Sequence, residues 1–399
     1  MTGRPARFCR LLVVALMAAV LQATPARAAA QGPPDGVVTW GASADRIGEA
    51  VADRGYRMVV HTSVAGRDPR IRLSNAFGDR PVTFDSVYAG IRKEGAELVR
   101  RTNRRLTFDG SASVTVPPGA TAYSDPLPGR LPAGTDLVVS VHSPDAAGPL
   151  TGHWMAMQTS YATQGDHTAE EGGAHWSETI GSWFYLDAVS VRADAGAVVA
   201  LGDSITDGWQ STTDVNRRWP DYLARRLQKS RNTVKGVANE GISGNKVLAD
   251  GAGQSALNRL DRDVLSQPGV RTVFLFEGVN DIKAHTGVTA QDLIDGYREI
   301  ADRVHAAGKC VVGATVAPFK GWPEWDPAAE AVRQEVNAFI RDGGAFDAVT
   351  DFDRILRSPY DQERMLPALD GGDHIHPNDK GMQAMADAVD LRSLDCADR

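Results

Sequence analysis

The sequence predicts two parts with different folds, an all-β sandwich followed by an α/β part built on a parallel sheet. Between residues 37 and 192, short β-type runs alternate with Gly, Pro, Asp and Asn, which is typical of a sandwich. After residue 196, strand-like and helix-like segments alternate, which indicates a mostly parallel sheet with helices on both faces. The 399 residues are 42% hydrophobic and 23% charged, enough apolar material for more than one core.

The strands of the N-terminal part are expected to be short, with one buried face. Residues 70–74 (RIRLS) alternate polar and apolar side chains, the pattern of such a strand. Segments rich in Pro and Gly at 117–119 and 131–134 are expected to form turns between these strands. The only candidate helix in this part covers 44–52. The other strands are expected at 56–62, 82–87, 113–116, 136–142 and 183–191.

In the C-terminal part, strands and helices alternate along the chain. The strands are expected at 197–201, 235–238, 272–276, 310–316 and 348–352, and the helices at 219–228, 255–265, 290–307, 327–341 and 378–388. Asp326 followed by Pro327 supports one helix start, because an acidic N-cap and a proline at the first helical position favour it. Sheets of this kind place their sites at the carboxyl ends of the strands, so functional residues are expected there.

The N-terminus has the three-part pattern of a secretory signal peptide. Arg4, Arg7 and Arg10 precede an uncharged apolar run at 11–21, and the small-residue segment 26–28 (ARA) follows. A helix needs about 20 residues to span a bilayer, so this shorter run is not expected to be a stable membrane anchor. The protein is therefore expected to be secreted.

These observations divide the chain into a signal peptide at 1–28, a β-sandwich accessory domain at 29–194 and an α/β domain at 195–399. The full chain has 43 Lys and Arg against 50 Asp and Glu, a net charge of −7. Cleavage removes four Arg and no acid, which leaves 39 against 50, or −11. That acidity favours solubility and argues against nucleic acid as a partner, because nucleic-acid binding needs a basic surface.

Two cysteines, Cys310 and Cys396, remain after the predicted cleavage, since Cys9 lies in the signal peptide. Unpaired thiols are uncommon in oxidising compartments, so a disulfide between these two is expected. The alternative is two unpaired thiols. Two cysteines alone cannot form a structural zinc site.

Four motifs in the C-terminal part are each expected just past a predicted strand. They are GDS at 202–204, GISGN at 241–245, GVND at 278–281 and DHIHP at 373–377. A serine in such a turn is often only a turn residue or helix cap, so one motif alone carries little weight. The four motifs in this order are much stronger evidence for an active site than any one of them.

Together these motifs resemble those of the SGNH, or GDSL, hydrolase superfamily, over roughly residues 198–389. The residues that give the superfamily its name would be Ser204, Gly244, Asn280 and His376. The resemblance implies a three-layer α/β/α flavodoxin-like fold and ester hydrolysis through an acyl-serine, with no cofactor and no metal. Residues 72–78 (RLSNAFG) are more loosely similar to secreted actinobacterial members, which suggests an attached β-domain.

The residue types also support this chemistry directly. A serine hydroxyl is a poor nucleophile, so Ser204 needs a base, and His376 is the expected one. Asp373, three residues earlier, is close enough to orient the imidazole and stabilise its charged form. The oxyanion of the tetrahedral intermediate needs fixed donors. The backbone amides of Ser204 and Gly244 and the side-chain amide of Asn280 can supply them.

Each assignment has a structural alternative. Gly244 is equally typical of a plain turn, and Asn280 of an Asx turn. Asp281 would then cap or brace the same loop. His374 competes with His376 for the role of base, and His376 is preferred.

Two other kinds of site are compatible with parts of the sequence. His374 and His376 with Asp373 have the spacing of metal ligands, but a metal site leaves the serine and asparagine motifs without a role. Residues 251–256 (GAGQSA) resemble a dinucleotide-binding fingerprint, yet they lie beyond the strand, and Arg271 stands where an acid is expected. Neither a metal nor a cofactor is therefore expected.

Three tryptophans are expected on the active face. Trp209 follows the serine motif, and Trp322 and Trp325 lie after the strand at 310–316. Their rings would stack on sugars or line an acyl pocket, unless they only pack the loops.

By analogy, the expected substrate is a small-molecule or polysaccharide ester with short acyl groups such as acetyl. The alternatives are a lipase acting on longer chains and an inactive carbohydrate-binding protein, and the oligomeric state is left open.

Overall fold

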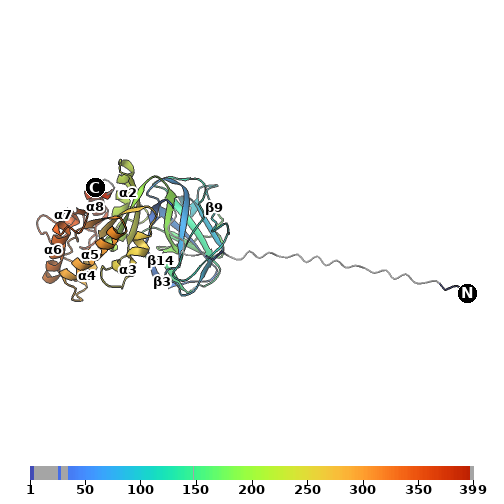
Figure 1. The fold of residues 1–399 in the computed structure, drawn as a ribbon, viewed down its shortest axis with the longest axis horizontal. Helices are drawn as coiled ribbons and strands as arrows, with labels where there is room; N and C mark the ends of the chain where they lie inside the picture. Colours follow the sequence, from blue (N-terminus) through green and yellow to red (C-terminus); the bar gives the residue numbers. More distant parts are fainter. Residues whose placement is uncertain (4–25, 28–34, 147, 396–399) are drawn as a thin grey trace.

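The computed structural model describes residues 1–3, 26–27, 35–146 and 148–395 (Figure 1). Most of the predicted signal peptide, including Cys9, lies outside the described residues, so the signal peptide stays a prediction. The disulfide expected between Cys310 and Cys396 also stays a prediction, because Cys396 lies outside the described residues.

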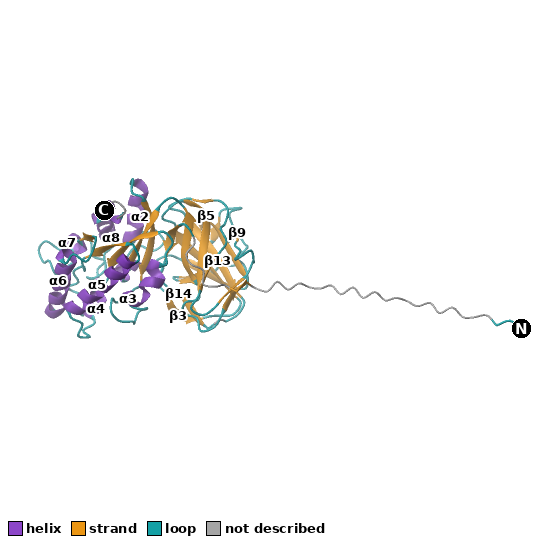
Figure 2. Ribbon diagram, viewed as in Figure 1, coloured by secondary structure: helices purple, strands orange, loops and turns teal. Residues whose placement is uncertain are grey.

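The N-terminal half consists of strands that pair almost entirely antiparallel (Figure 2). One sheet joins, in spatial order, β11 (Thr121–Tyr123), β5 (Gly66–Ser74), β18 (Leu186–Arg192) and β2 (Val37–Gly41), with β12 (Arg130–Leu131) also paired to β5. A second sheet joins β16 (Glu178–Ile180), β15 (Ser160–Gln164), β4 (Arg54–His61), β13 (Asp136–Ser143), β7 (Ser86–Glu94) and β8 (Glu97–Leu98), with β9 (Arg104–Arg105) also paired to β7. Two smaller sheets join β1 (Ala26–Arg27), β10 (Val114–Val116) and β6 (Val82–Phe84), and β17 (Trp183–Phe184), β14 (Pro149–His153) and β3 (Asp45–Glu49).

Residues 44–52 contain a strand, so the helix considered there is wrong. In its place, β3 (Asp45–Glu49) pairs antiparallel with β14, and Gly152 lies opposite Asp45. Gly48 has a φ of +117°, a conformation that interrupts a helix and that glycine adopts readily. The pairing with β14 and this glycine therefore override the local periodicity.

The C-terminal half contains a parallel sheet with the spatial order β20 (Val234–Gly241), β19 (Gly196–Gly202), β21 (Val270–Phe276), β22 (Cys310–Ala314) and β23 (Ala348–Thr350). All five predicted strands are present in the expected places. The last is shorter than expected because Asp351 caps the helix α7 (Phe352–Leu356), accepting a hydrogen bond from the backbone N of Arg354 at 3.1 Å. The chain therefore turns helical at Phe352.

Helices cover both faces of the parallel sheet, as the alternation in the sequence predicts (Figures 1 and 2). Val199 and Val273 face one core, and Val198 and Phe274 face the other. The first core is covered by α3 (Ala256–Arg259), the π-helical turn η1 (Leu260–Leu265), α4 (Val279–Lys283), α5 (Ala290–Ala306) and α6 (Pro327–Asp342). The second is covered by α1 (Ser204–Asp207), α2 (Trp219–Lys229), α7, α8 (Asp379–Ala388) and the 3₁₀ turn η2 (Leu391–Leu394).

The two halves pack against each other along the edge of the parallel sheet. β2 lies beside β20, where Ala42 forms a parallel bridge with Asn239. The Oγ of Ser63 accepts a hydrogen bond from the backbone N of Val237 at 2.9 Å. One cluster of buried hydrophobic side chains runs through both halves. The N-terminal strands are therefore held in a fixed position beside the strand ends of the α/β half.

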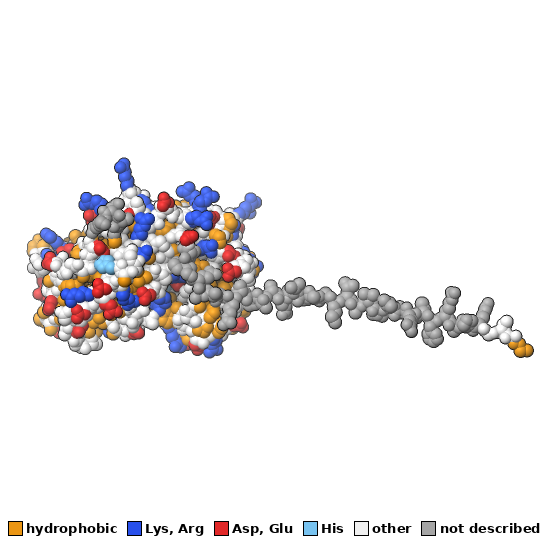
Figure 3. Space-filling model, viewed as in Figure 1, with side chains coloured by type: hydrophobic (Ala, Val, Ile, Leu, Met, Phe, Trp, Pro, Cys, Tyr) orange, Lys and Arg blue, Asp and Glu red, His pale blue; other side chains and the backbone are white. Residues whose placement is uncertain are grey.

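The surface mixes charges of both signs. On the face shown in Figure 3, Lys and Arg side chains are interspersed with Asp and Glu side chains, a pattern that favours solubility. Within the described ranges, no helix combines the length and the apolar character that a membrane span requires.

Candidate active site

Ser204 is the first residue of α1, directly after the tight turn that follows β19. The side chain of Asp203 caps α1 by accepting a hydrogen bond from the backbone N of Ile205 at 2.9 Å. A Cβ on Gly202 would lie 2.2 Å from the Oγ1 of Thr206, so only glycine fits this close turn. Burial raises the pKa of Asp203 to about 7.

Three residues from two distant segments form one chain of hydrogen bonds. The Oγ of Ser204 lies 2.8 Å from Nε2 of His376, and Nδ1 of His376 lies 2.7 Å from Oδ2 of Asp373. The other carboxylate oxygen of Asp373 accepts hydrogen bonds from the backbone N of His376 and of Ile375, at 2.9 and 3.2 Å. The structure thus brings together the serine, histidine and aspartate that the sequence predicts as catalytic.

The charges in this hydrogen-bond chain suit proton transfer. Burial lowers the pKa of His376 below its usual value of 6.5, although Asp373 acts in the opposite direction. Burial also acts to raise the pKa of Asp373, but hydrogen bonds from His376 hold it below its usual range. Near neutral pH the imidazole is therefore neutral beside a charged carboxylate, the state of a general base that can accept the proton of Ser204.

The predicted oxyanion-hole residues lie beside the serine. Gly244 has a φ of +82°, which glycine adopts without strain, and it lines the same cavity as Ser204. Asn280 also lines the cavity, and its Nδ2 donates a hydrogen bond to the carbonyl O of Asn245 at 2.9 Å. Since an amide nitrogen carries two hydrogens, one remains for an oxyanion.

Asp281 braces the loops that carry these donors. Its carboxylate accepts hydrogen bonds from the backbone N of Val247 at 2.8 Å and of Leu248 at 3.1 Å. The loop after β20 and the start of α4 are therefore held together. The bracing role considered for Asp281 matches its position in the structure.

A cavity of about 340 Å³ surrounds Ser204. Its lining residues are Trp154, Met155, Ser204, Trp209, Ser243, Gly244, Asn280, Lys283, Trp322, Ile375 and His376. The ring centroids of Trp209 and Trp322 lie 6.4 and 6.0 Å from that of His376. Trp325, predicted to bind substrate, does not line the cavity. Its ring packs against the core and below Lys320, whose Nζ lies 5.1 Å from the ring centroid.

Five cavity residues were not predicted from the sequence: Trp154, Met155, Ser243, Lys283 and Ile375. Ser243 and Ile375 lie within two of the recognised motifs, and Lys283 lies two residues after a third, so proximity to a motif is a signal that would have found them. Trp154 and Met155 come from the N-terminal half, and no sequence pattern connects them to the motifs.

The competing assignments do not match the geometry. Nδ1 of His374 lies 2.7 Å from Oδ2 of Asp370, so its imidazole and that of His376 have different carboxylate partners. Residues 251–256 form a loop closed by Asn245, whose Nδ2 donates to the carbonyl O of Ala252 at 2.7 Å. That loop supports the active-site turn and does not follow a strand directly.

The family model that matches this chain covers the part that carries the motifs. Residues 200–384 match the model of the GDSL-like lipase/acylhydrolase family. An aryl esterase from M. smegmatis is similar at 19% identity and a TM-score of 0.42, over 50% of this chain and 100% of that one. A carbohydrate acetylesterase from Sinorhizobium meliloti is similar at 18% identity and a TM-score of 0.39, over 48% of this chain and 95% of that one. A search of curated proteins finds no match.

Proposed function

The chain carries a GDSL-like lipase/acylhydrolase domain and is a carboxylic ester hydrolase, and we propose that Ser204 is its nucleophile. The observation that carries this proposal is the unbroken hydrogen-bond chain from Ser204 through His376 to Asp373. A serine, a base and an orienting carboxylate in contact are what acyl transfer requires.

In the proposed reaction, Oγ of Ser204 attacks the ester carbonyl carbon while its proton moves to Nε2 of His376. The backbone N–H groups of Ser204 and Gly244 and the amide of Asn280 stabilise the resulting oxyanion. The intermediate collapses, the C–O bond to the alcohol breaks, and His376 returns the proton to that alcohol. Water then attacks the acyl-serine by the same route, which releases the acid and restores Ser204.

The proposed substrate is a carbohydrate ester with a short acyl group such as acetyl. The cavity is small and walled by the rings of Trp209 and Trp322, and aromatic rings suit the apolar face of a sugar. A lipase acting on long acyl chains is the alternative, and it would need an extended apolar channel for the chain.

A series of 4-nitrophenyl esters with acyl chains from two to twelve carbons tests the acyl preference. The value of kcat/KM is expected to fall at least about tenfold once the acyl chain outgrows the cavity, because a small pocket discriminates at each added methylene. Highest turnover on the longest chains would contradict the proposal and favour a lipase. Equal turnover on all of them would also contradict it.

We further propose that the protein is secreted and that its N-terminal strands form a β-sandwich accessory domain. Secretion is supported by the Arg-rich and apolar N-terminal pattern. The sandwich is supported by a shared core, to which one large sheet contributes Val38 and Ile71 and the other contributes Met58 and Val141.

A further inference from the structure

A second cavity, of about 450 Å³, adjoins the catalytic cavity at the boundary between the two halves. The two cavities share Trp154, Met155 and Ser243. The N-terminal half contributes most of the other lining residues, which are Ser43, Asp45, Arg46, Ile47, Gly48, Gly152 and His153. The opposite wall is formed by Asp207, Ile242 and Ala252. We call the two cavities together the boundary groove.

Buried hydrogen bonds fix the N-terminal wall of the boundary groove against the catalytic loops. Nε2 of His153 lies 2.9 Å from Oδ1 of Asp207, the last residue of α1. The other carboxylate oxygen of Asp207 accepts hydrogen bonds from the N and Oγ of Ser243, at 3.0 and 2.9 Å. α1 begins with Ser204, and Ser243 precedes Gly244. The N-terminal half is thus connected to both the nucleophile and an oxyanion donor.

The protonation of His153 strengthens this connection. Its Nδ1 faces the carbonyl O of Ser43 at 2.9 Å and its Nε2 faces Asp207, so both nitrogens need a hydrogen. Burial lowers the pKa of His153, but Asp207 and the neighbouring carbonyls outweigh burial and raise it above the usual value. These buried hydrogen bonds on both ring nitrogens hold the imidazole in one orientation between the two halves.

Trp154 stands at the point where the two cavities meet. Trp154 is 72% exposed, although its neighbours His153 and Met155 are buried. The Oγ of Ser182 donates to the carbonyl O of Trp154 at 2.7 Å, which fixes the backbone. A large aromatic ring left in solvent on a rigid backbone is typical of a binding surface. The groove also offers polar groups from Asp45 that could bind hydroxyls.

We propose that the boundary groove binds the alcohol part of the substrate, an oligosaccharide, and that Trp154 stacks on a sugar ring next to the acylated one. The proposal rests on the proposed esterase function and names its substrate class. The combination of an exposed aromatic face with hydrogen-bonding groups matches a sugar ring, which is apolar on its faces and polar at its edge. The N-terminal half is then part of the substrate site.

The test compares Trp154→Ala with the wild type on two acetyl esters. One is an acetylated oligosaccharide long enough to fill both cavities, and the other is 4-nitrophenyl acetate, which reaches only the first. For the oligosaccharide, kcat/KM is expected to fall roughly 3- to 10-fold, the loss of one stacking contact. For 4-nitrophenyl acetate, which meets Trp154 only at the edge that the two cavities share, the loss is expected to be clearly smaller, less than about twofold. Tyr360→Ala is the matched control, because Tyr360 is 96% exposed and lines neither cavity.

Equal losses on both esters would overturn the proposal, because Trp154 would then only shape the catalytic cavity. No loss on either ester would overturn it too. A wild type that cleaves 4-nitrophenyl acetate but not the oligosaccharide would exclude a sugar occupant. A wild type that cleaves no ester at all would instead refute the proposed function.

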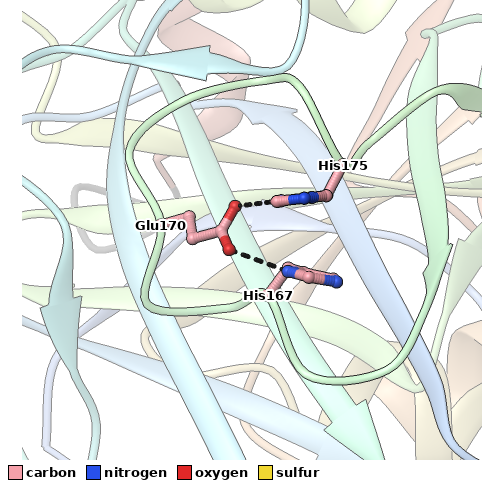
Figure 4. A group of neighbouring side chains, drawn as sticks. All are labelled: His167, Glu170 and His175. Atoms are coloured by element: carbon pink, nitrogen blue, oxygen red, sulfur yellow. Dashed lines mark hydrogen bonds and ion pairs between the residues drawn. The ribbon is translucent and has the colours of Figure 1, made fainter.

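An independent observation concerns the loop between β15 and β16. There the side chains of His167, Glu170 and His175 converge, with their candidate ligand atoms within 4.8 Å of one another (Figure 4). Nδ1 of His167 lies 2.8 Å from one oxygen of Glu170, and Nδ1 of His175 lies 2.7 Å from the other. The two imidazole rings stack with centroids 4.0 Å apart.

Hydrogen bonds from two side chains, Arg57 and Asn103, hold the backbone of that loop. The guanidinium of Arg57, which is fully buried, donates to the carbonyl O of Ala96 at 2.8 Å, of Gly172 at 3.1 Å and of Glu170 at 2.6 Å. Asn103 donates to the carbonyl O of Thr168 at 2.9 Å. The three side chains therefore converge on a loop that is ordered by protein contacts, which lowers the cost of binding a ligand there.

We propose that His167, Glu170 and His175 bind a divalent zinc ion. Two imidazole nitrogens and one carboxylate oxygen are a ligand set that Zn²⁺ prefers, with water in the fourth position. The cluster lines neither cavity of the boundary groove, so the ion would stabilise the loop and take no part in ester hydrolysis.

Calorimetric titration of the metal-free full-length protein with ZnCl₂ tests the site. One equivalent is expected to bind, to raise Tm by roughly 5 °C at saturation and to leave esterase activity unchanged. The double variant His167→Ala/His175→Ala should lose both effects, whereas His374→Ala, which removes an exposed histidine elsewhere, should keep them. Absence of saturable binding, or binding that survives the double variant, would show only a hydrogen-bonded cluster and overturn the proposal.

Discussion

Ser204→Ala is expected to lower kcat on 4-nitrophenyl acetate by about 10⁴-fold or more, while the fold is retained. Alanine removes the Oγ that attacks the carbonyl carbon, and no other hydroxyl is hydrogen-bonded to His376 within the described residues. The residual rate would come from the oxyanion donors alone. Steady-state kinetics on purified protein, with Tm measured on the same sample, gives the result.

The control for this prediction is Ser230→Ala. Ser230 caps the end of α2, where its Oγ donates to the carbonyl O of Leu227 at 2.8 Å, so it lies outside the cavity. A fluorophosphonate should label the wild type and Ser230→Ala but not Ser204→Ala. Wild-type turnover or labelling in Ser204→Ala would refute the nucleophile assignment.

The catalytic hydrogen-bond chain could be predicted from the sequence because it depends on a general property of parallel sheets. Ser204 follows β19 directly, and the loop between α7 and α8 brings His376, 172 positions away, within hydrogen-bond distance of it at the carboxyl end of that strand. Motifs placed at strand ends therefore identify neighbours in space without any knowledge of distances. The strands themselves are buried apolar runs, which the sequence reveals directly.

The contribution of the N-terminal half could not be predicted in this way. Trp154 follows β14, the central strand of a small three-stranded sheet, and its contact with the cavity depends on how the two halves pack. No local pattern encodes that packing. Trp325 was predicted from its place in the sequence to lie on the active face. Its ring packs against the core instead and does not line the cavity.

Asp373→Asn is expected to lower kcat by about 10³- to 10⁴-fold, although it changes the shape of the side chain very little. Oδ1 of the asparagine can keep the hydrogen bonds from the backbone N of Ile375 and His376. The new amide, however, faces Nδ1 of His376 as a donor where Oδ2 was an acceptor. The imidazole must then carry its hydrogen on Nε2, which can no longer accept the proton of Ser204.

A pH profile separates this positioning role from a loss of structure. Asp373 acts to raise the pKa of His376, so its neutralisation should move the acid limb of kcat/KM to lower pH, in addition to lowering the plateau. A variant that was only partly unfolded would have a lower kcat/KM at every pH, but the acid limb of its pH profile would stay at the same pH. The control is His374→Ala, because His374 is hydrogen-bonded to Asp370 and should leave both the plateau and the limb in place. An unshifted limb in Asp373→Asn, or an equal loss in His374→Ala, would contradict the assignment of Asp373 as the residue that orients the base.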